Sequence, residues 1–542
     1  MVRELQVSVT LPIYTFDVET DPFKHGRVPV PFSCGLFDGV NYWEYWGDTC
    51  IADMMTQLEN LPPGYVYAHN GGRFDFFFIM PWILGSDMRI INSRIISAKI
   101  QGVYGEHELR DSFAIMPFAL NKYKGEGHKQ EIDICKLEKR VRSKHRSEIL
   151  EYLKRDCTSL HLLVSKFCET FGSKTLTIGS ASMKELKKVH SFENLDSGDD
   201  ADLRALYYYG GRVECFEQGI IKARKGHHFK VFDVNSMYPF AMKSVRHPIG
   251  KPTHESREIE DSTMFLSVTG RNQGAFPSIV KGKIMFDLPH GTFHVTRHEY
   301  DVALEFNLFQ LERVERCVNF DGRTATFSEF VDKFYNLRKV ADSQGDEIMK
   351  LFYKFILNSA YGKFGQNPDN YRQYTITEST SDLRSDGWEM DTLEHGDRYI
   401  VWSKPSTDTS RFNVATGASI TGASRAILLR AIATARRPLY CDTDSLICED
   451  LPLKQDASEL GAWKTEAEFD TAAIAGRKLY ALFDGETCVK QANKGVAVTA
   501  IDIWNICCGD VIESKRDAPS FKLDGSYNFI KRRVRMTGEK RP

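Results

Sequence analysis

The chain lacks the features that mark membrane, secreted and zinc-binding proteins. It has no run of about 18 consecutive apolar residues, so we expect no membrane-spanning helix. Its amino-terminal segment has no apolar signal core, so we expect no secretory signal peptide. The 12 cysteines are scattered without Cys-x-x-Cys spacing, which disfavours a zinc site and suits a reducing cytoplasm.

The chain also lacks an excess of charge of either sign. The net charge is −2, with 71 Lys and Arg against 73 Asp and Glu, so overall composition does not indicate nucleic-acid binding. Any binding of phosphates must therefore come from local basic surface. One candidate lies at the carboxyl end, where either a grip on duplex DNA or a solvated tail fits the residues Lys531, Arg532, Arg533, Arg535, Lys540 and Arg541.

The length and composition predict a multidomain globular protein. A chain of 542 residues is too long for one hydrophobic core, and two to four domains are expected. The hydrophobic fraction of 42% and charged fraction of 27% are typical of soluble domains.

The segment 350–364 carries polar residues at the spacing of one helix face. They stand three or four positions apart: Lys350, Lys354, Asn358 and Tyr361. The opposite face is apolar and is expected to face the core. Lysines meet phosphates as point charges and an aromatic ring packs on a base or sugar, so the polar face suits a nucleoside triphosphate. Taken alone, the segment also fits a solvated amphipathic helix.

Acidic residues lie in short β-type segments before and after this helix. Asp233 lies in one, whereas Asp442 and Asp444 lie two positions apart in the other and point to one side of a strand or turn. Carboxylates that converge from separate segments can hold two Mg²⁺ ions about 3.5–4 Å apart. One ion would activate a 3′-hydroxyl and the other would stabilise leaving pyrophosphate. An isolated Asp-Thr-Asp is more often a turn, but the three segments in this order indicate nucleotidyl transfer.

The three segments closely resemble motifs A, B and C of family B DNA polymerases, at residues 233–239, 354–363 and 440–445. The resemblance implies that Asp233 and Asp444 bind metal, with Asp442 as an accessory carboxylate. It also implies that Val234 contacts both metal and nucleotide.

The same resemblance implies the contacts of the incoming nucleotide. Lys354 and Lys350 would bind the triphosphate, with Asn358 on the same face. Tyr361 would line the nascent base pair, and Tyr238 would lie under the sugar. A phenol ring packed at C2′ leaves no room for a ribose hydroxyl, so Tyr238 would favour deoxynucleotides.

The first third of the chain carries a second acidic set. Asp17 and Glu19 share one face of a predicted strand, which is costly unless both are solvated or bound to metal. Tyr152 and Asp156 are four positions apart on a predicted helix. Together with Asp75, these carboxylates can hold a two-metal hydrolytic site in which Tyr152 orients the attacking water. Surface charge is the alternative for any single acid.

This ordered set resembles the Exo I, Exo II and Exo III motifs of the 3′–5′ proofreading exonucleases that precede family B polymerase domains. The resemblance implies that the frayed 3′ end contacts His69, Asn70, Phe74 and Ser112. Lys129 resembles the catalytic lysine of the module. Two departures stand out: the spacing from Asn70 to Phe74 is one residue longer than in the family pattern, and Phe113 replaces a leucine.

Three further segments resemble DNA-contact motifs of the family. They are the Tyr-x-Gly-Gly link between modules, a template-contacting Thr-x-x-Ala/Gly-Arg motif and a primer-steadying Lys-x-Tyr motif, and the matching residues are Tyr208, Gly210, Gly211, Thr421, Arg425, Lys478 and Tyr480. The two glycines would let the backbone approach template phosphates. A serine interrupts the usual small residue before Arg425.

Two long insertions indicate a branch of the family. About 120 residues separate Asp233 from Lys354, and a second long stretch covers residues 365–420, both longer than simple connections. Extra segments at these places resemble the protein-primed branch. There the first insertion, TPR1, contacts a terminal protein, and the second, TPR2, encircles DNA and gives processivity and strand displacement.

The predicted fold class is α+β and multidomain: a ribonuclease-H-like 3′–5′ exonuclease domain, then a palm, fingers and thumb polymerase domain with TPR1-like and TPR2-like insertions. The expected order is exonuclease 1–175, linker and first palm part 176–250, TPR1-like insertion 251–335, fingers 336–364, TPR2-like insertion 365–412, second palm part 413–495 and thumb 496–542. We expect one antiparallel palm sheet that brings Asp233 to Asp444. We expect two fingers helices broken at Gly345, and a loop at the polar stretch 191–202.

The predicted function is a strand-displacing DNA-dependent DNA polymerase with proofreading, replicating a viral or linear-plasmid genome in the host cytoplasm. It would act as a monomer, away from membranes, with Mg²⁺ or Mn²⁺, two ions per active site. Its partners would be template and primer DNA, dNTPs, a terminal protein primer and a single-stranded-DNA-binding protein. Two alternatives stay open: a primer-independent or conventionally primed polymerase of the same family, and an exonuclease or nucleic-acid-binding protein with an inactive polymerase half.

Overall fold

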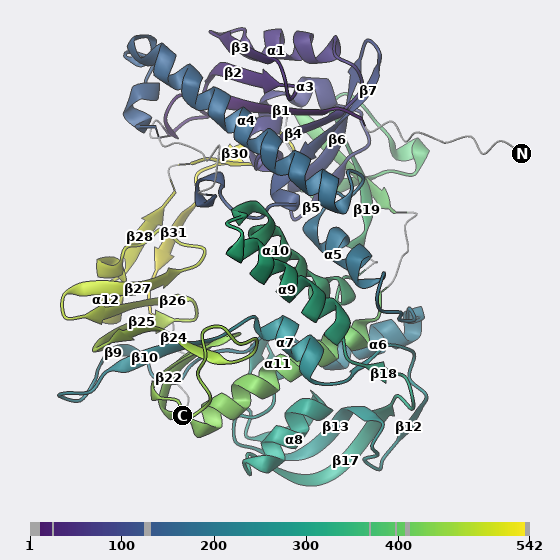
Figure 1. The fold of residues 1–542 in the computed structure, drawn as a ribbon, viewed down its shortest axis with the longest axis vertical. Coiled ribbons are helices and arrows are strands. Elements are labelled where there is room, and N and C mark those ends of the chain that lie inside the picture. Colours follow the sequence, from purple (N-terminus) through teal and green to yellow (C-terminus); the bar gives the residue numbers. More distant parts are fainter. Residues whose placement is uncertain are drawn as a thin grey trace, which may run out of the picture.

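The computed structural model describes residues 11–23, 26–123, 132–367, 370–395, 398–406, 412–516 and 518–536. The amino-terminal unit occupies one end of the molecule, and a pair of helices separates it from a sheet-rich body at the other end (Figure 1). None of the described helices combines the length and apolar composition that crossing a membrane requires.

The amino-terminal unit is built on a seven-stranded mixed sheet with the order β3-β2-β1-β4-β7-β6-β5. The strands are β1 (Ile13–Thr20), β2 (Pro31–Phe37), β3 (Tyr42–Trp46), β4 (Tyr65–Ala68), β5 (Arg89–Ile91), β6 (Arg94–Gly102) and β7 (Gly105–Asp111). Strand β4 runs parallel to both β1 and β7, whereas the other pairs are antiparallel. Helices α1 (Cys50–Glu59) and α4 (Arg146–Phe171) pack on this sheet. This part of the chain is therefore a mixed sheet covered by helices.

Strand β1 forms because apolar residues alternate along it. It lies between β2 and β4 in the sheet, and both of its faces are covered. Tyr14, Phe16 and Val18 are at most 5% exposed. On the other face, the Thr15 hydroxyl donates a 2.8 Å hydrogen bond to the carbonyl oxygen of Cys157 in α4. This bond fixes the strand that carries two predicted carboxylates against the helix that carries a third.

The predicted palm is a five-stranded antiparallel sheet with the order β24-β10-β23-β22-β8. Its strands are β8 (Val213–Cys215), β10 (Phe229–Val234), β22 (Arg436–Asp442), β23 (Ser445–Asp450) and β24 (Trp463–Phe469). Helices α7 (Met237–Ser244) and α11 (Val414–Thr434) lie beside it. The sheet joins segments about 200 residues apart, as the sequence predicted.

Two helices form the predicted fingers, α9 (Ser328–Ser343) and α10 (Glu347–Phe364). Gly345 lies between them with φ of 72°, a left-handed conformation that favours glycine, so the predicted break is confirmed. Helix α9 begins eight residues before the predicted boundary at 336. The reason is that the earlier turns bury Phe330, Val331 and Phe334.

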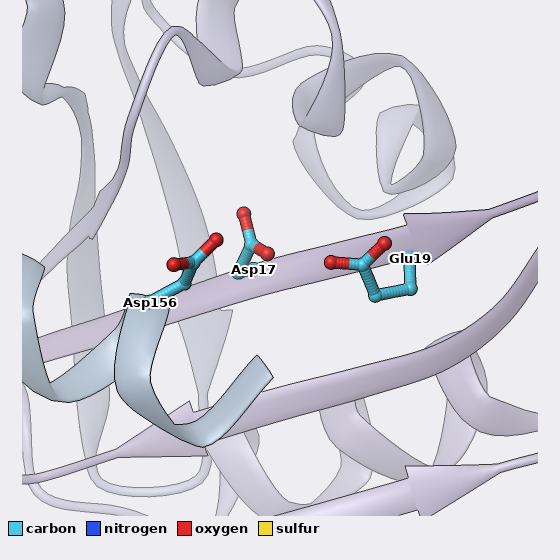
Figure 2. Close-up of side chains that lie close together, drawn as sticks. All are labelled: Asp17, Glu19 and Asp156. Carbon is cyan, nitrogen blue, oxygen red and sulfur yellow. The ribbon is translucent and has the colours of Figure 1, made fainter. Parts of the chain in front are cut away.

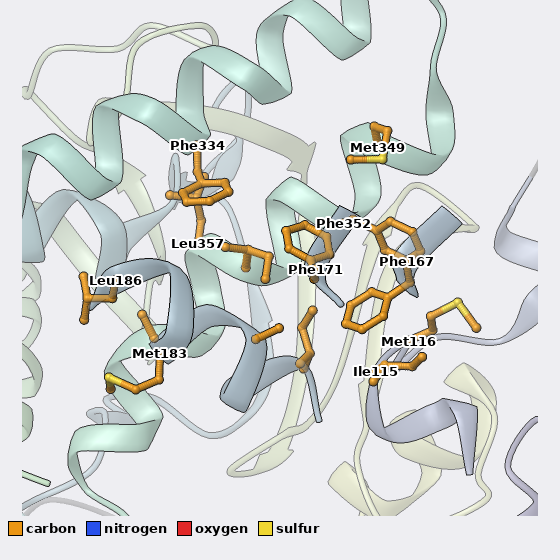
Figure 3. Packing of buried hydrophobic residues seen from close by; sticks show 14 of the residues in the cluster. Ile115, Met116, Phe167, Phe171, Met183, Leu186, Phe334, Met349, Phe352 and Leu357 are labelled. Carbon is orange, nitrogen blue, oxygen red and sulfur yellow. The ribbon is translucent and has the colours of Figure 1, made fainter. Parts of the chain in front are cut away.

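The helix pair shares one hydrophobic core with the amino-terminal unit and with α5 (Ile178–Leu186). The rings of Phe118 and Phe355 stack with centroids 5.5 Å apart, and Phe167 meets Phe352 edge-on at 5.4 Å. Figure 3 shows this packing, with Phe167 and Phe352 in one continuous layer. The two halves of the chain are therefore joined by core packing rather than by a linker alone.

The first predicted insertion folds as a four-stranded sheet, β12-β17-β13-β16, with one helix. Its elements are β12 (His254–Ser256), β13 (Thr263–Asn272), β16 (His290–Thr296), α8 (Arg297–Glu305) and β17 (Phe309–Asn319). A hairpin of β14 (Ser278–Val280) and β15 (Lys283–Met285) extends from it, and β11 (His247–Pro248) pairs with β18 (Thr324–Ala325).

The second predicted insertion is a three-stranded sheet with the order β19-β21-β20, formed by β19 (Arg372–Glu378), β20 (Glu389–His395) and β21 (Tyr399–Pro405). It packs against the amino-terminal unit. Met88 and Tyr374 form a β-bridge, and Ile376 and Val401 are buried in the core of that unit.

The carboxyl-terminal part contains a four-stranded sheet of β9 (Gly219–Lys222), β25 (Thr471–Gly476), β26 (Leu479–Asp484) and β27 (Thr487–Asn493), covered by α12 (Ala500–Cys507). Strand β28 (Ile512–Lys515) pairs with β31 (Lys531–Val534). A hairpin of β29 (Ser520–Phe521) and β30 (Tyr527–Asn528) forms the tip of this part. Residues 531–534 of the basic segment are thus a strand rather than a tail, whereas Lys540 and Arg541 lie outside the described residues.

The prediction of a loop over 191–202 is wrong in its second half. Helix α6 (Ser197–Tyr207) begins there, because the Asp196 side chain caps it by accepting a hydrogen bond from the backbone of Asp199. Ser197 is exposed on the first turn, whereas Asp200 is buried and pairs with Arg204, and Leu203 and Tyr207 are also buried.

Candidate active sites

The palm sheet brings the predicted metal-binding acids together. Asp233 on β10 pairs in register with Ser445 on β23, the residue that follows Asp444. The backbone N–H of Val234 donates a 2.9 Å hydrogen bond to the carbonyl oxygen of Asp444. The two carboxylates therefore start from adjacent strand ends, as predicted, and their oxygens are of the type that Mg²⁺ prefers.

The turn that carries Asp444 is tightly built. Thr443 has φ of 60°, and its N–H donates to the carbonyl oxygen of Arg212 at 2.7 Å. A Cβ on Gly211 would lie 2.9 Å from the Thr443 side chain, so a larger residue there would force Thr443 to shift. Gly211, one of the two glycines predicted to approach DNA, thus approaches the turn of the acidic site, whereas Gly210 is exposed and has nothing within 4 Å of the place that a Cβ would take.

Both acids are held in surroundings that disfavour their charge. Burial, and then the nearby Asp233 carboxylate, raise the pKa of Asp444 to about 6. Burial also raises the pKa of Asp233, although the Lys464 ammonium opposes this effect. A site in which one carboxylate raises the pKa of a second, buried carboxylate gains from binding a cation.

Asp442 does not lie in the same pair. The Lys478 ammonium donates 2.6 Å hydrogen bonds to both of its carboxylate oxygens, and Tyr440 donates a third at 3.3 Å. Lys478, which is predicted to steady the primer, is thus bound to the predicted accessory carboxylate in this structure. Tyr480 is 6% exposed, with its ring 5.1 Å from that of Tyr440.

Helix α10 presents its predicted polar face toward the acidic pair. Partial desolvation and the cations Arg338 and Lys464 lower the pKa of Lys354, while Asp233 opposes them. Lys350 is one turn further back, where it pairs with Asp342 at 2.6 Å and Glu347 at 3.3 Å. Lys354 is therefore the lysine that faces the proposed triphosphate site. Asn358, one turn further along, is partly buried.

Two aromatic rings close this side of the site. Tyr238 of α7 and Tyr361 of α10 stack with centroids 3.8 Å apart and an interplanar angle of 14°. Burial raises the pKa of both hydroxyls, and the Asp444 carboxylate adds to each effect. The two rings predicted to contact base and sugar thus form one wall beside the predicted metal-binding acids.

The second acidic centre lies in the amino-terminal unit. Asp17 and Glu19 of β1 and Asp156 of α4 each place a carboxylate oxygen within 4.8 Å of the others. Figure 2 shows the three side chains converging from the strand and the helix. Glu19 is 9% and Asp156 3% exposed, and carboxylate oxygens at this spacing fit a divalent ion.

Asp75 completes the predicted acid set from a separate turn. It is 3% exposed at the start of α2 (Asp75–Phe78), and burial, followed by the Asp17 carboxylate, raises its pKa well above the ordinary value. The preceding turn depends on glycine, because a Cβ on Gly72 would lie 1.9 Å from the carbonyl oxygen of Ile95. The extra residue in this motif is therefore absorbed by a glycine-dependent turn. Helix α3 (Met80–Ile83) follows directly.

The predicted single-strand contacts fall into two groups. Phe74 is partly exposed at the turn and Asn70 has φ of 62°. The hydroxyl of Ser112 is fully buried and lies 2.9 Å from Nδ1 of His69, whose Nε2 lies 2.9 Å from the carbonyl oxygen of Phe118. Ser112 thus orients His69 in this conformation and does not reach the surface itself.

Two other residues complete the predicted exonuclease set. Tyr152 lies one turn before Asp156 on α4 and is partly exposed. Lys129 lies outside the described residues.

Arg425 and Thr421 of α11 are 2% and 3% exposed, so neither side chain reaches the surface in this conformation. Arg425 donates to both carboxylate oxygens of Glu299 in α8, at 2.6 and 2.9 Å. It also donates to the carbonyl oxygens of Tyr209 and Gly210, at 2.8 and 2.9 Å. The arginine thus shapes the segment that contains Tyr208, Gly210 and Gly211, and Tyr208 packs on Gly365 at the end of α10.

Sequence reasoning missed several residues of these sites. Lys464 pairs with Asp233 at 3.2 Å from the adjacent strand β24. Phe521, in the β29–β30 hairpin, stacks on Phe77 at 5.0 Å and meets Phe74 edge-on at 5.8 Å. Neither contact has a local sequence signal. The Lys464–Asp233 pair depends on the register between β10 and β24, and the Phe521 contacts join segments hundreds of residues apart.

Comparisons with known proteins identify the class of this chain. Residues 121–449 match the family model for DNA polymerase type B, organellar and viral. The chain is 43% identical over 569 residues to the DNA-directed DNA polymerase of Enterobacteria phage PRD1, covering 99% of this chain and 100% of that protein. The chain therefore belongs to the family of type B DNA polymerases found in organelles and viruses.

More distant relatives agree on the fold. The DNA polymerase of Bacillus phage phi29 is 27% identical over 406 residues, covering 68% of this chain and 66% of that protein. The solved structure of phi29 DNA polymerase complexed with primer-template DNA superimposes with a TM-score of 0.72 at 19% identity, covering 97% of this chain and 100% of that chain. The predicted multidomain α+β fold of a family B polymerase is thereby confirmed, and the chain is similar to the phi29 enzyme over nearly its whole length.

Proposed function

We propose that this polymerase extends a DNA 3′ end by two-metal nucleotidyl transfer between the palm sheet and helix α10. The observation that carries the proposal is the pairing of Asp233 with the turn of Asp444 beside Lys354. Asp233 and Asp444, with Val234 between them, would hold two Mg²⁺ or Mn²⁺ ions. When bound, these ions would activate the 3′-hydroxyl and stabilise the leaving pyrophosphate.

The remaining residues act on the nucleotide. Lys354 supplies a positive charge to the triphosphate on the side facing Asp233, and the neighbouring cations Arg338 and Lys464, which help to lower its pKa, favour the arrival of an anion. Tyr238 and Tyr361 form a flat wall that excludes water beside the acids. A ring in the place of Tyr238 would exclude a 2′-hydroxyl by steric contact.

A second proposed activity is 3′–5′ proofreading at the amino-terminal acidic centre. Asp17, Glu19, Asp75 and Asp156 would hold divalent ions, and Tyr152 would orient the attacking water. Phe74, which directly precedes Asp75, and His69 would pack on an unpaired 3′ nucleotide. The proposal is supported by the four side chains all being carboxylates, which offer the oxygen ligands that divalent ions prefer, and by the burial of Glu19, Asp75 and Asp156.

The third part of the proposal concerns initiation and displacement. We assign the β12–β17 unit a role in contacting a terminal protein, whose hydroxyl would accept the first nucleotide. The β19–β21 sheet and the β29–β30 hairpin would close around the DNA, since a Cβ on Gly525 in the hairpin would lie 2.7 Å from the ring of Tyr399 in β21. The enzyme would act in the host cell as a monomer. Transfer of labelled dNMP to protein in a primer-free reaction tests the initiation mode, and extension only from DNA primers favours conventional priming.

Separation of the two activities tests the proposal as a whole. We expect Asp444→Ala to abolish nucleotide addition in primer extension while the degradation of a single-stranded 3′ end continues. Asp17→Ala with Asp75→Ala should do the reverse. Each variant is the folding control of the other, because the sites lie in different sheets. Loss of both activities in a folded Asp444→Ala protein would contradict two independent centres.

A further inference from the structure

Lys464 is a charged residue in the polymerase centre that no motif assigns. It stands directly across from Asp233 in the β10–β24 pairing. Its ammonium lies 3.2 Å from Oδ1 of Asp233 and 3.2 Å from Oε1 of Glu466. Its side chain is 32% exposed, so it reaches the acids from the open side of the sheet.

The same ammonium also belongs to a cluster of positive charge. Lys464 and Arg338 both help to lower the pKa of Lys354, so these three cations lie near one another, and Lys464 lies beside Asp233. Like charges that crowd together in a partly desolvated cleft repel one another unless an anion is shared between them. In the structure Lys464 contacts two such anions, Asp233 and Glu466; during synthesis the polyanionic triphosphate would be a much stronger one.

We propose that Lys464 is a resident counter-ion of the polymerase centre, which exchanges Asp233 for the triphosphate of the incoming nucleotide. The proposal rests on the proposed metal site at Asp233 and Asp444. In the empty enzyme, Lys464 balances the charge of Asp233 and competes with a divalent cation for its oxygen. With nucleotide bound, Lys464 turns toward the phosphates beside Lys354, and Asp233 is released to accept the ion.

This exchange couples two binding events. A lysine side chain has a flexible stem, so its ammonium can move a few ångströms without moving the strand. Asp233 keeps its place because its strand is hydrogen-bonded on both sides, to β23 and to β24. The empty site therefore has a reduced affinity for a divalent ion, and a correct triphosphate relieves the competition.

The test compares full-length Lys464→Gln with the wild type. We expect the variant to bind Mn²⁺ about three- to tenfold more tightly in the absence of nucleotide and DNA, because a competing positive charge is removed. Binding is measured by Mn²⁺ electron paramagnetic resonance in an Asp17→Ala, Glu19→Ala background, which removes carboxylates of the other centre. At saturating Mn²⁺, the KM for dNTP should rise about tenfold, with a smaller change in kcat.

Lys230→Gln is the matched control. Lys230 forms the same kind of ion pair across the same two strands, with Glu468 at 3.3 Å, and its side chain is 35% exposed. We expect it to change neither Mn²⁺ affinity nor KM, whereas Lys464→Arg should restore both values. If Lys464→Gln leaves either quantity at the wild-type value, the exchange is refuted. If Asp444→Ala removes no Mn²⁺ site from the background protein, the failure lies in the proposed metal site instead.

Discussion

Individual carboxylates in the two centres are held in places that raise their pKa, and this sets the behaviour of the metal-free protein. Asp444 has a pKa of about 6 in the folded chain, raised by burial and by Asp233. Burial, and then the nearby Asp17 carboxylate, raise the pKa of Asp75 well above its ordinary value. Such groups oppose folding while they are charged and contribute affinity once a cation is bound.

Replacement of Asp444 by asparagine tests this balance through stability. The folded-state pKa lies above the ordinary value of 3.8, so the folded protein binds the proton more tightly than the unfolded chain does. The charged Asp444 carboxylate therefore destabilises the folded protein. This destabilisation is absent below about pH 4, grows as the pH rises and is complete above about pH 6. Without divalent ions, we expect Asp444→Asn to stabilise the protein at pH 7.5 by about 1–2 kcal/mol, less than the full shift because the side chain is partly exposed.

The measurement is urea unfolding of both proteins at pH 7.5 and at pH 4.5 in a chelator. The gain should shrink at the lower pH, because Asp444 is then largely protonated in the folded wild type. Excess Mg²⁺ at pH 7.5 should reverse the order by stabilising only the wild type. A gain that is equal at both pH values would show that burial of charge is not its cause.

Residue-level prediction from sequence succeeded where chemistry is written in short motifs. Asp233, Asp444 and Lys354 could be found because each stands in a motif whose spacing is local. The Arg425–Glu299 pair could not, because it joins a palm helix to the insertion across 126 positions. Ser112 could be located but not interpreted, since its burial under His69 depends on the β7 register.

At the scale of elements, the small hairpin β29–β30 carries an unexpected role. Phe521 packs on three rings of the amino-terminal unit, those of Phe74, Phe77 and Phe78, with centroids 5.0–5.8 Å away. One of them, Phe74, is a predicted contact of the single-stranded 3′ end. The hairpin therefore supports a residue of the second acidic centre from the far end of the chain.

We expect Phe521→Ala to reduce degradation of single-stranded 3′ ends about three- to thirtyfold, because Phe74 loses a packing partner and its ring becomes mobile. Addition of the first nucleotides to an annealed primer should change little. Tyr527→Ala is the matched control, since Tyr527 pairs with Phe521 in the hairpin but is 44% exposed. Equal loss in both variants would point to the hairpin as a whole and would contradict a specific role for Phe521.

Elements with strong local patterns were predictable, and those fixed by distant contacts were not. Helix α10 has an apolar face in which Phe352 and Ile356 are fully buried, as its periodicity indicates. Helix α9 begins earlier than predicted because its first turns pack in the core. Helix α6 was missed because its start depends on capping by a single aspartate. The β19–β21 sheet had no pattern that distinguished it from an irregular insertion.

Across the whole molecule, one continuous core joins the amino-terminal unit, α5, the fingers helices and parts of the palm. The β19–β21 sheet and the β29–β30 hairpin meet at a second point, where Gly525 lies against Tyr399. Gly525 has φ of 81°, which favours glycine, and a side chain there would also collide with the ring. This contact is the closure on which the proposed displacement activity depends.

We expect Gly525→Ala to shorten products on a singly primed circle and to stop synthesis after about one lap, because the hairpin can no longer seat against Tyr399. Extension on a short open template should be retained. Gly485→Ala is the control for backbone strain alone, since Gly485 has φ of 59° with nothing within 4 Å of its Cβ position. Products of several laps from the Gly525→Ala enzyme would show that this closure is not needed for displacement.

The ion pair between Glu299 and Arg425 has a consequence for any attempt to shorten this enzyme. Both side chains are at most 2% exposed, and the acid comes from the β12–β17 unit while the base belongs to the palm. A minimal polymerase made by excising that unit would retain a guanidinium in the interior with its counter-charge gone, at a cost of about 3–5 kcal/mol. A viable miniature must therefore exchange Arg425 for an apolar residue in the same design.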